Sequence, residues 1–125
     1  MRYAVSGNAT ASLLPVSGNN LVSVLGRNVT TGRAFWLRGI ALKPTTSLSD
    51  VWLFDASAGT PATGDAATTK YPALIIPAAT GVQFNNGVWN FPAPGIKFTT
   101  GVCAAYNTCG VTTATGGIAC WGYEE

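Results

Sequence analysis

The spacing of short β-type runs is the feature of this sequence that most constrains its fold. No segment repeats apolar residues at i, i+3, i+4 and i+7 over three turns, so no amphipathic helix is expected. Runs rich in β-branched and aromatic residues recur instead about every 8 to 12 residues, separated by Gly, Pro, Thr and Asn. This spacing predicts an all-β sandwich or barrel. The runs cover 20–29, 34–42, 49–57, 71–78, 81–86, 87–91, 95–106 and 116–123.

The length of 125 residues suits a single domain. We expect residues 21–125 to form one β-sandwich domain, preceded over residues 1–20 by an N-terminal arm or by the first strands. The segment 56–69 is rich in Ala, Gly and Thr, which is typical of an exposed loop between two strands.

Charged residues are scarce. The chain has seven Lys and Arg and five Asp and Glu, well below the quarter or so that is usual in soluble domains. Such a surface favours burial against another subunit, although a monomer coated with Ser, Thr and Asn is the alternative. The basic residues are scattered, so nucleic acid is not an expected partner. No apolar stretch is long enough to span a membrane, and the first residues do not resemble a secretion signal.

Residues that commonly carry catalysis are missing or dispersed. The chain contains no histidine, and Asp50 and Asp55 flank a strand that separates them by about 16 Å, too far for a carboxylate pair. No glycine-rich phosphate loop is present. The three cysteines do not form a CxxC pair, and no histidine is available to complete a zinc site. We therefore expect neither enzymatic activity nor a bound metal or cofactor.

The run 95–106 alternates between two faces. Phe98, Val102 and Ala104 share the face expected to be buried, together with Ile96 and Tyr106. A glycine inside such a run, here Gly101, indicates a bulge or the close approach of another backbone.

The last two runs are adjacent in sequence and are expected to pair as a hairpin with its loop near 110–112. That register places Cys103 opposite Cys120 on the outer face. Free thiols are favoured there, although a bridge between the two remains an alternative in an oxidising setting. Cys109 lies near the loop and is expected to be unpaired.

Two strands carry aromatic residues on both faces. Phe35 and Leu37 oppose Trp36, while Val51 and Leu53 oppose the pair Trp52 and Phe54. Either one face of each strand meets a partner, or the strand lies between the core and an overlying loop such as 56–69.

The C-terminal part of the chain resembles a known family. The segments "VWLFDASAGT", "FNNGVWNFPAPGIKFTTGVCAAY" and "GGIACWGYEE" are similar, over about residues 50–125, to small jelly-roll proteins of tailed bacteriophages that serve as capsid decoration (cement) proteins. Val102-Cys103 stands where that family usually has Leu-Tyr, and the closing strand carries Cys120-Trp121.

The resemblance implies an antiparallel jelly-roll-like β-sandwich of about eight strands. It also implies a homotrimer, made in the host cytoplasm, that binds the major capsid protein on the outer surface of the head. Trp36, Trp52 and Phe54 are then the expected subunit contacts, and Arg2 and Tyr3 the expected capsid contacts. Two other functions remain open. One is a receptor- or carbohydrate-binding sandwich of a tail fibre, or a lectin, in which exposed Trp stacks on sugar, and the other is a structural subunit of the tail or baseplate.

Overall fold

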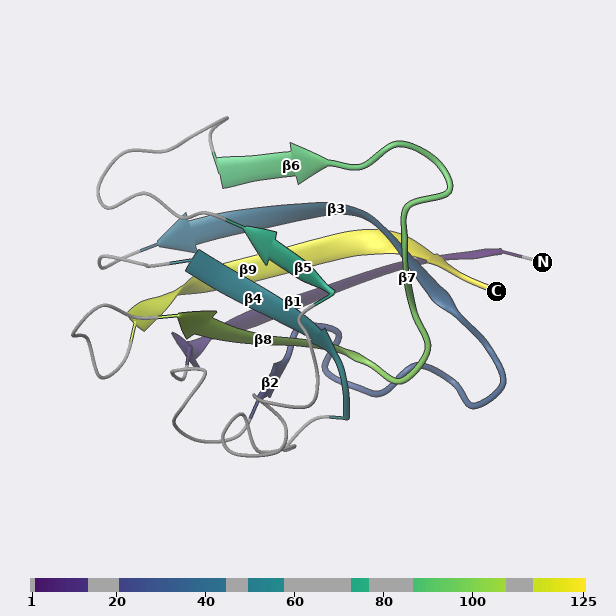
Figure 1. The fold of residues 1–125 in the computed structure, drawn as a ribbon, viewed down its shortest axis with the longest axis horizontal. Coiled ribbons are helices and arrows are strands. Elements are labelled where there is room, and N and C mark those ends of the chain that lie inside the picture. The colour runs from purple at the N-terminus through teal and green to yellow at the C-terminus, as the bar shows by residue number, and fades with distance from the viewer. Residues whose placement is uncertain (1, 14–20, 45–49, 58–72, 77–86, 108–113) are drawn as a thin grey trace.

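The protein is an all-β sandwich of two antiparallel sheets (Figure 1). The computed structural model describes residues 2–13, 21–44, 50–57, 73–76, 87–107 and 114–125. No helix in these ranges is long and apolar enough to cross a membrane. The strands are β1 (Tyr3–Leu13), β2 (Val22–Ser23), β3 (Phe35–Pro44), β4 (Asp50–Asp55), β5 (Leu74–Ile76), β6 (Val88–Asn90), β7 (Ile96–Phe98), β8 (Val102–Asn107) and β9 (Ala114–Glu124).

The strand order is that of a jelly roll, as predicted. Sheet A runs β1-β9-β3-β6, with β7 also paired to β3, and sheet B runs β2-β8-β4-β5. With the short β7 set aside, the first strand pairs with the last, the second with the second-last, and so on inward to β4 and β5. This is one long hairpin of four ladders rolled up, so that β9 also meets β3 and β8 also meets β4.

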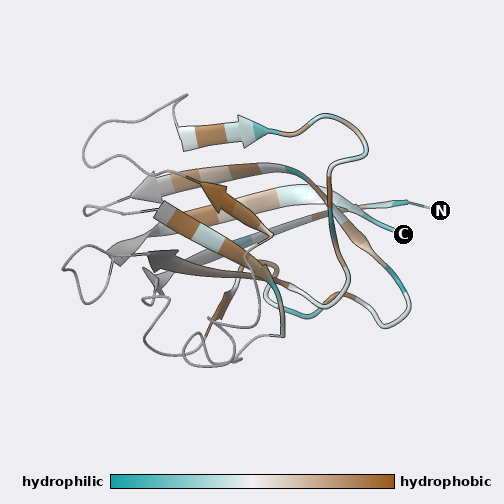
Figure 2. Ribbon diagram, in the orientation of Figure 1, coloured by the Kyte–Doolittle hydropathy of each residue, from teal (hydrophilic) through white to brown (hydrophobic). Residues whose placement is uncertain are grey.

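The main core lies between the two sheets. Strand alternation sends Phe35 and Leu37 of β3 and Val51 and Leu53 of β4 into it, where all four are fully buried. Phe98, Val102 and Ala104 join them, which confirms the buried face predicted for these residues. Hydrophobic segments of β3, β4 and β5 are visible in Figure 2. The core holds the two sheets face to face.

A second apolar cluster covers the outer face of sheet B. Phe54 and Trp52 of β4 pack there beside Cys103 and Ala105 of β8, and Leu21 and Ala56 complete the cluster. Phe54 is only 2% exposed. β4 carries apolar residues on both faces, and on the outer face the chain itself buries Phe54. Trp52, on the same face, is only partly buried.

The predicted hairpin between the last two runs is wrong. β8 belongs to sheet B and β9 to sheet A, so Cys103 and Cys120 lie on different sheets and neither forms a disulfide. Both are buried, Cys103 in the second cluster and Cys120 in the main core. The error comes from assuming that neighbours in sequence pair, whereas in a rolled hairpin β8 and β9 pair with strands far away in the chain.

Gly101 marks the close approach of another backbone, one of the two predicted alternatives. A Cβ at this position would lie 2.5 Å from the carbonyl oxygen of Ala56. The run 95–106 is consequently two strands, β7 and β8, rather than one. Ala56 is fully buried at this contact, so it does not belong to an exposed loop.

Other predicted elements are shorter or longer than expected. The run 20–29 contains only the two-residue β2, whereas residues 3–13 form one strand of sheet A rather than a detached arm. The predicted run 81–86, the loop residues 58–69, the hairpin loop 110–112 and Cys109 lie outside the described residues.

Two adjacent isoleucines in β5 differ in burial, so replacing each of them tests which one belongs to the core. Ile76 is 1% exposed and Ile75 is 48% exposed. Replacing Ile76 with Ala should lower the free energy of unfolding by about 2–4 kcal/mol, because it leaves a cavity between the sheets. The same change at Ile75 should cost less than about 1 kcal/mol. Urea denaturation measures both values, and equal losses would contradict the burial of Ile76.

Candidate functional site

A β-bulge in β3 shapes the outer face of sheet A. The register of β3 against β9 shifts between Leu37 and Gly39. Leu37 and Ile40 both point into the main core, so Arg38 and Gly39 lie together on the opposite face. Bulges of this kind redirect side chains and are frequent beside binding sites.

Phe91, which follows β6, holds the bulge in place. The backbone N–H of Phe91 donates to the carbonyl oxygen of Arg38 at 2.8 Å, and Nε of Arg38 donates to the carbonyl oxygen of Phe91 at 3.0 Å. These reciprocal hydrogen bonds fix the backbone of Arg38 and the orientation of its guanidinium group.

Trp121 of β9 packs over the same bulge. A Cβ on Gly39 would lie 2.2 Å from two atoms of the indole ring, so the ring occupies the space that a side chain at position 39 would take. Gly39 is thus required for the ring to rest on the backbone of the sheet. Trp121 remains partly exposed.

A hollow of about 390 Å³ lies beside Trp121 on this face, and we call it the Trp121 hollow. Its lining combines aromatic side chains with small polar ones, and Arg38 is the one charged residue among the lining residues that the structure describes. The lining side chains that matter below are Ser6, Arg38, Asn90, Phe91, Trp121 and Tyr123.

A second group of side chains gathers at the end of sheet A where both termini lie (Figure 1). Nε1 of Trp36 donates to a carboxylate oxygen of Glu125 at 3.2 Å, and the same carboxylate forms an ion pair with Arg2 at 3.0 Å. Nζ of Lys97 lies 5.7 Å from the ring centre of Trp36. We call Arg2, Trp36, Lys97 and Glu125 the terminal cluster.

Two of the five predicted contact residues, Arg2 and Trp36, lie in one place. They share Glu125 as a partner, because β1 pairs with β9 and β9 with β3. Tyr3 follows Arg2 but is in register with Glu124 and, across β9, with the core residue Phe35, so strand alternation directs it to the opposite face from Trp36. Tyr3 is 46% exposed, and the guanidinium of Arg33 lies 5.5 Å from its ring centre.

The other two predicted contact residues, Trp52 and Phe54, lie on sheet B with ring centres 6.3 Å apart. Phe54 is buried by the chain's own second cluster. Trp52 is partly exposed, but its Nε1 is buried and has no hydrogen-bond partner in the described part of the chain. An unpaired buried donor of this kind costs about 1–3 kcal/mol.

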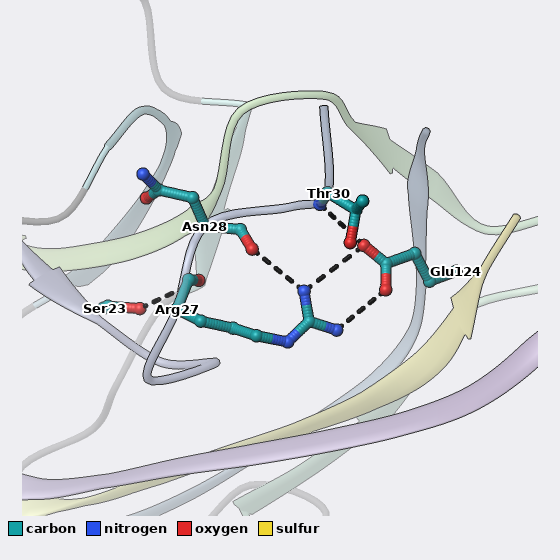
Figure 3. A network of polar contacts seen from close by, with 5 residues as sticks. All are labelled: Ser23, Arg27, Asn28, Thr30 and Glu124. Carbon is teal, nitrogen blue, oxygen red and sulfur yellow. Dashed lines mark hydrogen bonds and ion pairs between the residues drawn. The ribbon is translucent and has the colours of Figure 1, made fainter. Parts of the chain in front are cut away.

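The most buried ion pair joins the loop after β2 to the end of β9 (Figure 3). Nη2 and Nη1 of Arg27 donate to the two carboxylate oxygens of Glu124 at 2.7 and 3.3 Å, and the N–H of Thr30 adds a third bond at 2.8 Å. The hydrogen bonds from Arg27 outweigh burial and lower the pKa of Glu124 to about 2. This geometry holds the loop against the last strand.

Asp55 anchors the turn between β7 and β8. Its carboxylate accepts hydrogen bonds from the N–H groups of Thr99, Thr100 and Gly101 and from the hydroxyl of Thr99, at 2.7 to 3.1 Å. Burial acts to raise the pKa of Asp55, but these donors outweigh it and the pKa is lowered.

The two described cysteines are held as thiols. Burial, with a contribution from the charge of Asp55, raises the pKa of Cys103 to about 11, and burial raises that of Cys120 to about 11. Sγ of Cys103 donates to the carbonyl oxygen of Ala56. Within the described ranges, no three His, Cys, Asp or Glu side chains are placed to hold a metal ion.

Among the surfaces described above, the Trp121 hollow and the terminal cluster are the ones suited to binding.

No family model, no curated protein and no solved structure matches this chain. Its function is therefore inferred from its fold and its surface.

Arg38, Gly39 and Trp121 are not among the site residues predicted from the sequence. The signal was available in "WLRGIAL", where Arg38 and Gly39 together interrupt the alternation of apolar residues and indicate a bulge. No local pattern pairs Arg27 with Glu124, because 97 residues separate them.

The Arg27–Glu124 pair predicts a specific pH dependence. The pKa of Glu124 falls from 4.5 to about 2 on folding, so its contribution to stability is complete above about pH 5 and disappears as the pH falls toward 2. Glu124→Gln should lower the free energy of unfolding at pH 7 by about 2 kcal/mol. Most of the difference from the parent protein should disappear as the pH falls to about 2, because protonation of Glu124 removes the charge that Gln lacks, while the titration of Asp55 is common to both proteins and cancels.

Denaturant unfolding between pH 2 and 7 measures this difference. Glu125→Gln is the matched control, since it removes the neighbouring carboxylate, whose partner Arg2 is exposed. A gap between Glu124→Gln and the parent protein that stayed constant down to pH 2 would contradict the pairing.

Proposed function

We propose that this protein is a structural protein of a phage virion, a capsid decoration (cement) protein that binds the outer capsid surface and stabilises the head. The observation that carries the proposal is the terminal cluster. Trp, Tyr and Arg are the residues that most often dominate binding energy at protein interfaces. Trp36 and Arg2 share a partner here, and the exposed Tyr3 follows Arg2, in a chain with few charges. The resemblance of residues 50–125 to phage jelly-roll proteins supports the choice of a capsid.

A cement protein acts by adding contact area across the junctions between capsid subunits. Internal pressure from packaged DNA must then break these contacts as well as those of the shell. The terminal cluster suits this role because it lies on a rigid sheet, so that little flexibility is lost on binding. Arg2 and Tyr3 contact the major capsid protein in this proposal, as the sequence analysis expected.

Assembly as a homotrimer on the head is part of the same proposal. Trp36 and Trp52 are the contacts that we assign to neighbouring subunits. Trp52 is supported by its unpaired Nε1, because a neighbouring chain that supplied an acceptor would remove the cost of that buried donor. Phe54 is no longer assigned to the interface, since it is 2% exposed and packs within its own chain.

Binding to undecorated heads tests the proposal. We expect purified protein to add ordered density, in groups of three, to the outer surface of heads assembled without it, and to raise the temperature at which those heads open. Cryo-electron microscopy and a thermal release assay for the packaged DNA measure the two effects.

Trp36→Ala should weaken binding to heads, because Trp36 joins neighbouring subunits of the proposed trimer and its N–H holds the carboxylate of Glu125 that also pairs with Arg2, a proposed capsid contact. Asn90→Ala is the control, since Asn90 is an exposed residue of β6 that belongs neither to the terminal cluster nor to the surface around Trp52. Both variants must be as stable as the parent protein, so their denaturant midpoints should differ from its midpoint only by the small shift usual for surface substitutions. Binding confined to the tail, or absent from heads, would reject the cement function and leave the fold unaffected.

A further inference from the structure

The Trp121 hollow has the composition of a small-ligand site. We propose that it binds a carboxylated saccharide, that is, a pyranose ring bearing one carboxylate. The hollow lies on the outer face of sheet A and has a volume of about 390 Å³, within the range of known small-ligand sites. It is separate from the ion pairs of the terminal cluster, so this inference does not depend on the proposed virion function.

Charge is the first reason for this ligand class. Among the described residues of the lining, Arg38 alone is charged, so the hollow is complementary to a ligand with a single negative charge. In the described part of the chain, its guanidinium makes one hydrogen bond, from Nε to Phe91. That bond fixes the guanidinium plane, while the two terminal nitrogens have the spacing that a carboxylate accepts in a bidentate pair.

The aromatic residues supply the second reason. One face of a pyranose ring carries C–H groups with a small positive charge, which are attracted to the negative face of an aromatic ring. Trp121, backed by the sheet at Gly39, offers such a ring in a position that needs no rearrangement. Tyr123, which is 37% exposed, adds a second ring and a hydroxyl group.

Neutral polar groups supply the third reason. Ser6 and Asn90 are exposed and face the hollow from β1 and β6, the strands at its two sides. Their hydroxyl and amide groups both donate and accept hydrogen bonds, as do the hydroxyl groups of a sugar. A purely apolar ligand would leave these groups and Arg38 unpaired.

Two other hollows have a different chemistry. One, lined by Gly32, Arg33, Lys97, Thr99 and Glu125 among others, carries charges of both signs and borders the terminal cluster. The other also borders Ser6 and Trp121, and none of its described lining residues is charged. Of these three hollows, as lined by the described residues, the Trp121 hollow alone combines one fixed cation with aromatic rings.

Titration with defined saccharides tests the proposal. The full chain is titrated with galactose oligosaccharides that carry a single galacturonate residue and, in parallel, with uncharged galactose oligosaccharides of equal length. Tryptophan fluorescence and calorimetry follow the binding. We expect saturable binding of the acidic oligosaccharide, a change in tryptophan emission, and binding of the neutral one at least about tenfold weaker, as expected for the loss of a charged hydrogen-bonded pair.

Arg38→Gln should weaken binding of the acidic oligosaccharide by about tenfold or more. Arg33→Gln removes the same charge from an exposed residue outside the hollow and should bind like the parent protein. Asn90→Ala alters an exposed residue of the lining and should weaken binding of both oligosaccharides, which keeps the test decisive if Arg38→Gln does not fold. Absence of saturable binding to the parent protein, or equal losses in Arg38→Gln and Arg33→Gln, would overturn the proposal.

Discussion

The ladder between the first and last strands is the contact on which the rest of the molecule depends. β1 and β9 pair over eleven residues, and β9 also pairs with β3, so one strand connects the outermost part of the roll to its middle. Both candidate binding surfaces are built across these three strands. Trp121 packs on the bulge of β3. The carboxylate of Glu124 binds Arg27, and that of Glu125 binds Arg2 and Trp36, all within the first 36 residues. The function of the surface is thus tied to a contact between the two ends of the chain.

Local patterns predicted most strands but not their pairing. Residues such as Phe35, Leu37, Val51 and Leu53 identify their own strands, because alternation and β-branching act over a few residues. The partner of β9 depends instead on how the whole chain rolls, and the hairpin predicted from sequence proximity was wrong. The cover over Phe54 was foreseen only as one of two alternatives, because Leu21 lies 33 positions away and its approach is a property of the tertiary structure.

The candidate sites show the same division. Arg2, Tyr3 and Trp36 were selected from the sequence, but Glu125, which joins two of them, was not. The bulge at Arg38 and Gly39 interrupts the alternation of apolar residues in β3 and is therefore visible in the sequence. The position of Trp121 over the bulge follows only from the register of β9 against β3. Residue types that bind were therefore recognisable from sequence, and the places where they meet were not.

The position of the termini has a consequence for engineering. Tyr3 and Glu124 are register partners at one end of sheet A, so the two ends of the polypeptide emerge side by side. A short linker between them would give a circular backbone, and the sandwich could then be reopened at a surface turn without loss of any ladder. A cargo domain fused to either end would occupy the same position beside the sheet.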